Sequence, residues 1–183
     1  HLETIIEAAE ILKDRPDICF LLVGDGAERA RLLDIVKQKN IKNVVVAGQL
    51  EKQAMPALWN RVHVSLIVLR KSDTFKSVIP SKIFESLAMQ KPIILGVEGE
   101  SADLLKESAS GVCITPEDST QLAAQVKLLA DDGEYYDQLS RGGRQFVHQF
   151  YDRDELAMQY ITRITAFLSL GDAITANHGG GHD

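Results

Sequence analysis

The segment PSKIFESLAM holds the residues whose types and spacing are best suited to chemistry: Ser81, Lys82 and Glu85. Successive residues of an α-helix are about 100° apart, so these three share one side of a helix that Pro80 can begin. The opposite side is apolar and must face the interior; it carries Ile83, Phe84, Leu87 and Ala88. A helix start presents unpaired N–H groups and the positive end of the helix dipole, which together attract an anion. The segment therefore offers donors for a phosphate and, one turn further on, a carboxylate.

Two interpretations of Glu85 follow from the residues alone. A nucleoside diphosphate needs donors for its phosphate oxygens and an acceptor for its ribose hydroxyls, and one carboxylate can accept from both hydroxyls. Arg70, Lys71 and Lys76 in the preceding loop would add positive charge. In the second interpretation, Lys82 and Glu85 form an ordinary surface ion pair worth about 0.2–0.5 kcal/mol. The spacing leaves both open.

Apolar runs that alternate with helical patterns surround this segment. We expect strands at 18–24, 43–48, 62–69, 92–96 and 111–115, with helices between them and only helices from residue 134 onward. The first strand is expected to be buried on both faces, and the third is also expected to be buried. This order predicts an α/β fold with a doubly wound parallel sheet, Rossmann-like, and extra helices at the end. Ligands bind such sheets at the carboxyl ends of the strands. The loops after Val23, Ala47, Leu69 and Leu95 are therefore the places to search.

Composition excludes several classes of protein. The 183 residues are 45% hydrophobic and 25% charged with a net charge of −6, which argues against a nucleic-acid partner. No apolar run approaches the length of a membrane span and no signal peptide is visible, so we expect a cytoplasmic protein. Cys19 and Cys113 lie in apolar runs and are expected to be core thiols. We expect one domain over 1–170 and a disordered polar tail over 171–183.

Motifs for other functions are incomplete. The turn VGDGAER lacks the third glycine of a dinucleotide fingerprint, so NAD binding is not expected. A non-enzymatic binding module of receiver type would need an acidic cluster at its strand ends, which here read VGDG, AGQL, VLRK and LGVE. His63 has no partner at metal-ligand spacing, so we expect it to be structural and expect no metal site.

Four segments together resemble a known family. FLLVGDGAERARL, VVVAGQLEKQAMPALWNRVHVSLIVL, PSKIFESLAMQKPIIL and GVCITPEDSTQLAAQVKLL are similar, in order and spacing, to the carboxyl-terminal domain of family-four glycosyltransferases, the donor-binding half of a GT-B fold. The resemblance runs from about Leu2 to Tyr160. It implies a retaining transferase that uses a nucleoside-diphosphate sugar, UDP-linked, with no metal or other cofactor. PSKIFESLAMQKP is the most specific part, and resembles most the amino-sugar transferases of bacterial polysaccharide assembly.

The resemblance also implies roles for individual residues. The family has two glutamates separated by seven residues; the second, which contacts the ribose, falls on Glu85. The first, near the donor sugar, falls on Ser77, so this chain departs from the family pattern there. The amides of Ser81 and Lys82 match the stretch that binds the distal phosphate.

Further matching positions lie in other loops. Backbone groups of Gln49 and Leu50 match the place where the family meets the base, and the Gly99 amide matches a glycine near the donor sugar. Arg70 and Lys71 are candidates to support the phosphate charge.

The resemblance also implies partners that this sequence does not supply. In the family an Arg and a Lys that bind phosphate, the first strand of the domain, and the acceptor-binding domain all precede the helix with which this chain begins. We therefore expect the 183 residues to be a fragment that binds the donor weakly and transfers nothing alone. The acceptor would be a glycan or a lipid-linked sugar at the inner face of a membrane. A nucleotide-sugar epimerase of the same architecture is the alternative within the GT-B fold.

Overall fold

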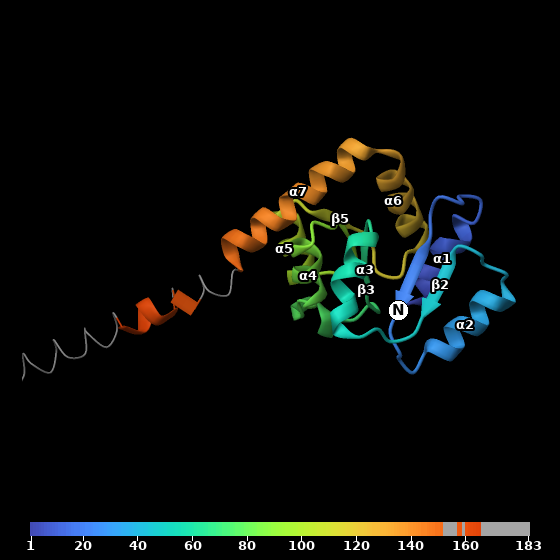
Figure 1. The fold of residues 1–183 in the computed structure, drawn as a ribbon, viewed down its shortest axis with the longest axis horizontal. Helices are drawn as coiled ribbons and strands as arrows, with labels where there is room; N and C mark the ends of the chain where they lie inside the picture. Colours follow the sequence, from blue (N-terminus) through green and yellow to red (C-terminus); the bar gives the residue numbers. More distant parts are fainter. Residues whose placement is uncertain (152–156, 159, 166–183) are drawn as a thin grey trace, which may run out of the picture. The chain divides into compact units, whose positions relative to one another are not determined.

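The computed structural model describes residues 1–151, 157–158 and 160–165, and its helices and strands alternate much as the sequence predicts (Figure 1). The strands are β1 (Phe20–Val23), β2 (Val44–Ala47), β3 (Ser65–Val68), β4 (Ile93–Gly96) and β5 (Gly111–Cys113). The α-helices are α1 (Glu3–Ile11), α2 (Arg29–Gln38), α3 (Met55–Arg61), α4 (Lys82–Ala88), α5 (Glu100–Ser108), α6 (Ser119–Asp131) and α7 (Gly133–Phe150). Two 3-10 helices, η1 (Lys52–Ala54) and η2 (Asp73–Ser77), precede α3 and α4.

All strand pairings among the described residues are parallel, which confirms the α/β class, but the strands form two sheets. β1 pairs with β2, with Phe20 opposite Val44. The second sheet has the order β3-β4-β5, with Ile93 of β4 opposite both Ser65 and Gly111. Within the described chain, β1 and β3 are each paired along one edge only.

One hydrophobic core joins the two sheets. Helix α1 packs against α6, and both helices contribute to this core. The core draws on β1 and β2 through Phe20 and Val44, and on β3 and β4 through Val68 and Ile94. Burying these side chains supplies most of the stabilisation that holds the two sheets in one unit.

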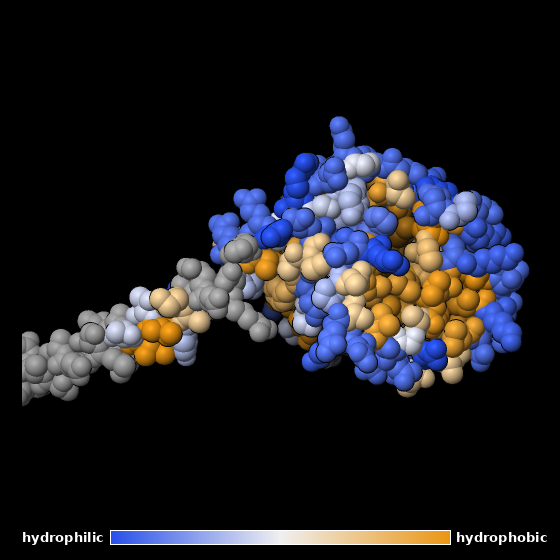
Figure 2. Space-filling view, in the orientation of Figure 1, coloured by the Kyte–Doolittle hydropathy of each residue, from blue (hydrophilic) through white to orange (hydrophobic). Residues whose placement is uncertain are grey.

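The prediction that the first strand is buried on both faces is wrong for β1, and its partner β2 is also partly exposed. All four residues of β4 are buried, but Leu21 and Val23 of β1 are 40% and 37% exposed, and Val45 of β2 is 48% exposed. Their neighbours along the strands, Phe20 and Val44, point into the core instead. Figure 2 shows apolar surface where Figure 1 draws these two strands. One face of the β1–β2 pair is therefore uncovered by the described chain.

The prediction for the two cysteines is also wrong, because Cys19 and Cys113 are both exposed. Cys19 lies just before β1. Cys113 ends β5, which pairs along one edge only among the described residues. An apolar run therefore did not place these thiols in the core.

The described residues from 146 onward belong to a second unit, distinct from residues 1–145. In this unit the ring of Phe146 lies 5.1 Å from that of Phe150 and 5.7 Å from that of Tyr151. Residues 157–158 and 160–165 are helical and expose Met158, Tyr160, Ile161 and Ile164. The predicted tail, 171–183, lies outside the described residues. None of the helices that the structure describes is both long and apolar enough to span a membrane.

Candidate functional site

Helix α4 presents Glu85 to solvent, as the helical spacing predicts. Ser81, Lys82 and Glu85 are all exposed, whereas Ile83 and Leu87 are 0% exposed. The apolar side of the helix therefore fixes it on the core and leaves the polar side available to a ligand.

Two neighbouring residues of α4 differ from the prediction. Ala88 is exposed, and Ser86 is buried in its place. The Ser86 hydroxyl lies 2.8 Å from the Ser65 hydroxyl of β3 and 2.7 Å from the Lys82 carbonyl oxygen. A buried serine is accommodated because its hydroxyl is hydrogen-bonded, and it ties α4 to β3.

The start of α4 retains its donors. Ile83 and Phe84 donate their amides to the carbonyls of Pro80 and Ser81, but no hydrogen bond from the amides of Ser81 or Lys82 to another described residue is found. No ion pair joins Lys82 to Glu85 among the described residues either, so the surface-pair interpretation finds no support. Two amides and one carboxylate thus remain available on the exposed side of α4.

The loop after β3 is held by charge pairs at its far end. Lys76 Nζ lies 2.7 Å from Asp73 Oδ1 and 3.8 Å from Glu98 Oε2. The hydrogen bond from Lys76, its charge and, more weakly, the charge of Lys71 hold the pKa of Asp73 below its ordinary value. Of the three basic residues that the sequence places in this loop, Lys76 is therefore committed to carboxylates of the protein. Ser77, the last residue of η2, is exposed.

Gly99 lies where two loops meet. Its φ is +82°, and a Cβ at this position would overlap the backbone carbonyl of Lys76. Two residues later, the buried Ser101 hydroxyl donates to the Val78 carbonyl at 2.6 Å. The loops after β3 and β4 are thus fixed against each other, and Gly99 permits the close approach.

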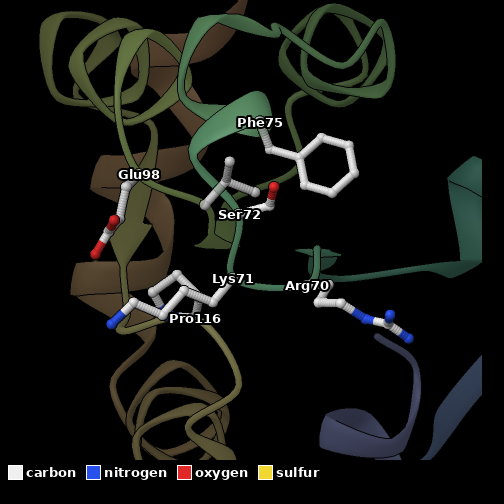
Figure 3. A pocket seen from close by; sticks show the side chains of 7 residues that line it. Arg70, Lys71, Ser72, Phe75, Glu98 and Pro116 are labelled. Carbon is white, nitrogen blue, oxygen red and sulfur yellow. The ribbon is translucent and has the colours of Figure 1, made fainter.

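A small hollow at the carboxyl ends of β3, β4 and β5 is lined by residues 70–72, Phe75, 97–98 and Pro116 (Figure 3). Figure 3 shows that the Arg70 side chain extends to the right, away from Lys71 and Glu98. The Lys71 side chain passes beside Pro116 and ends on the same side as Glu98. Because the two side chains diverge, their charges do not lie side by side. Arg70 is the one that points away from the Glu98 carboxylate.

Gln49 and Leu50 follow β2 and are both exposed. The turns after β1 and β2 are linked by a hydrogen bond from Gly24 N–H to the Gly48 carbonyl at 3.3 Å. No hydrogen bond or ion pair between Gln49 or Leu50 and the loops after β3 or β4 is found in the described chain. No group of three or more His, Cys, Asp or Glu among the described residues could hold a metal ion.

Two residues of this region make contacts that no sequence pattern indicates. The buried Ser101 and the exposed Glu117 each make a hydrogen bond to a different loop, Glu117 Oε1 accepting the Lys71 amide at 2.9 Å. Only the structure reveals which distant loops these two residues contact.

The family model for glycosyl transferases group 1 matches residues 1–146. The chain belongs to this family. A GT-B domain is thus favoured over a receiver-type binding module.

One curated protein is similar to this chain in sequence, and two solved structures share its fold. A protein of Escherichia coli (strain K12) named for glycosyl transfer in colanic acid biosynthesis, WcaI, is 28% identical over 89% of this chain and 39% of its own length. The C-terminal domain of a glycosyl transferase group 1 protein (LpcC) from Francisella tularensis has a TM-score of 0.69 at 19% identity, covering 82% of this chain and 79% of that structure. Anabaena HepE, solved in complex with UDP, has a TM-score of 0.76 at 17% identity, covering 90% of this chain and 44% of that one. The chain spans about two fifths of the length of the curated relatives it matches.

Proposed function

We propose that this chain is the donor-binding part of a retaining glycosyltransferase that uses a nucleoside-diphosphate sugar, with UDP as the nucleotide. Membership of the glycosyl transferases group 1 family supports the reaction class. The UDP-bound state of the HepE structure, which shares this fold, supports the choice of nucleotide. The polysaccharide-related name of WcaI supports an acceptor in cell-surface polysaccharide biosynthesis.

The observation that carries the proposal is the exposed polar side of α4. In the proposal the Glu85 carboxylate accepts hydrogen bonds from the ribose hydroxyls. An exposed carboxylate without a cationic partner in the described chain is ready to do this, because no ion pair has to be broken first. The neighbouring amides of Ser81 and Lys82 bind the distal phosphate.

Transfer breaks the bond between the anomeric carbon of the sugar and an oxygen of the distal phosphate, and negative charge develops on the departing diphosphate. Donors fixed in advance around that charge lower the barrier, because they need not reorient as it develops. In the proposal the amides of α4 and the side chains of Arg70 and Lys71 supply this stabilisation. No metal or other cofactor is assigned a step.

The remaining assignments concern the two ends of the donor. Backbone groups of Gln49 and Leu50 contact the base, and the Gly99 amide and Ser77 lie toward the sugar. The acceptor, a glycan or lipid-linked sugar, would be bound by another part of a longer protein, acting in the cytoplasm at the membrane face. The 183 residues alone would then bind donor without transferring it.

Calorimetric titration with UDP, GDP, ADP and NAD tests the proposal. We expect binding of UDP in preference to the other three, and at least about tenfold weaker UDP binding by Glu85→Ala, since a charged hydrogen bond contributes about 1.5–3 kcal/mol. Glu107→Ala is the matched control, because it removes an exposed carboxylate from α5 instead. Preference for NAD, or equal UDP affinity in the two variants, would overturn the proposed site.

A further inference from the structure

Glu117 is a central residue of a tight turn that leads from β5 into α6. Among the described residues, four that are not glycine have a positive φ: Asn40, Gln90, Ala109 and Glu117. The first three directly follow or cap the ends of α2, α4 and α5, where a left-handed residue commonly ends a helix. Glu117 lies instead just before α6, with a φ of +66°. The Asp118 N–H donates to the Thr115 carbonyl at 3.2 Å and closes a turn with Pro116 and Glu117 at its centre. A type II turn requires a positive φ at the second central residue, a conformation that glycine adopts at lower cost than glutamate.

The contact that Glu117 makes crosses between two loops. Its carboxylate accepts the Lys71 N–H at 2.9 Å, linking the loop after β5 to the loop after β3. Both loops line the hollow of Figure 3, through Pro116 on one side and residues 70–72 on the other. The bonded N–H belongs to the peptide that joins Arg70 to Lys71. Fixing this peptide sets the directions in which both cationic side chains leave the backbone.

We propose that Glu117 is a positioning residue for the anion-binding charge of Arg70 and Lys71. The turn that holds Glu117 directs its carboxylate to the Arg70–Lys71 peptide, and this bond keeps Arg70 pointing away from Glu98 and available to phosphate. The assignment rests on the proposed function, in which these cations stabilise the charge of the donor diphosphate.

Four variants separate positioning from a merely structural role. Glu117→Gly relieves the backbone strain and removes the bond, so we expect unchanged or higher stability but about five- to tenfold weaker UDP affinity. Glu117→Gln keeps an acceptor oxygen and should bind UDP within about twofold of the unsubstituted chain. Asn40→Gly relieves the same kind of strain at the end of α2 and should leave UDP affinity unchanged. Adding Glu117→Gly to Arg70→Ala/Lys71→Ala should cause no further loss, because Glu117 acts through these two residues.

The measurements are UDP titration, urea unfolding, and hydrogen exchange of the Lys71 amide. In Glu117→Gly we expect this amide to exchange at least about tenfold faster, which tests the contact without any ligand. Two results would overturn the proposed role of Glu117 but not the proposed function. One is an unchanged UDP affinity in Glu117→Gly, and the other is a joint loss of stability and affinity that Glu117→Gln does not rescue. Failure of the unsubstituted chain to bind UDP would instead overturn the proposed function, and this role with it.

Discussion

Substituting Gly99 by alanine should disrupt the contact between the loops after β3 and β4. A Cβ on residue 99 would overlap the Lys76 carbonyl, which is backbone and cannot swing aside as the end of a flexible side chain can. The φ of +82° with a ψ of −144° is also a conformation that alanine rarely adopts.

Both effects contribute to the expected loss of stability. The backbone strain costs about 1–3 kcal/mol. Relieving the overlap requires a backbone shift, which costs about 1–3 kcal/mol more. We therefore expect Gly99→Ala to lower the free energy of unfolding by about 2–6 kcal/mol, a large part of the stability of an ordinary domain.

Urea unfolding followed by circular dichroism measures this difference. Gly26→Ala is the matched control, because a Cβ there meets no atom within 4 Å and no positive φ is required. We expect the control to change stability by less than about 1 kcal/mol. If Gly99→Ala unfolded at the same urea concentration as Gly26→Ala, the close approach of the two loops would be refuted.

Three further predictions concern polar groups elsewhere in the fold. Asn43→Ala removes the side-chain amide that donates to two carbonyls of the α1 terminus, at 2.9 Å and 3.3 Å, and should cost about 1–3 kcal/mol in urea unfolding. Ser86→Ala leaves Ser65 without its buried hydroxyl partner and should cost about 1–2 kcal/mol in the same assay, whereas an unchanged midpoint would show that the pair contributes nothing. Asp17 has a pKa lowered to about 2, mainly by its hydrogen bonds from Arg15, so its contribution to stability is present above the ordinary value of 3.8 and lost as the pH falls toward 2. NMR titration should show this pKa moving up toward the ordinary value in Arg15→Ala, and an unmoved pKa would contradict that cause.

Much of the fold follows from periodicity. Helix α4 is the clearest case, because the helical turn by itself predicts that Ile83 and Leu87 lie inside and that Ser81, Lys82 and Glu85 lie outside, as they do. The order of parallel strands follows from alternating patterns in the same way. These features are local, so the spacing of residues along the chain contains them.

Features that depend on distant segments do not follow from the sequence. The apolar run of β1 predicts burial on both faces, yet Leu21 is 40% exposed, because a run of apolar residues does not say whether another element covers each face. The loop contacts of Gly99 and Glu117 are equally invisible, since Glu117 and Lys71 are 46 residues apart. Likewise, helical spacing does not distinguish a free Glu85 from one paired with Lys82, because that difference lies in where the two side chains point.

The most direct test of the central claim compares two ligands on two proteins. UDP and 2′,3′-dideoxy-UDP are titrated against the unsubstituted chain and against Glu85→Ala. If the Glu85 carboxylate holds the ribose hydroxyls, removing either partner should weaken binding by about tenfold, and removing both should cost little more than removing one. If Glu85→Ala lowers the affinity for both ligands by the same factor, Glu85 does not bind the ribose hydroxyls, and this result would contradict the proposed site.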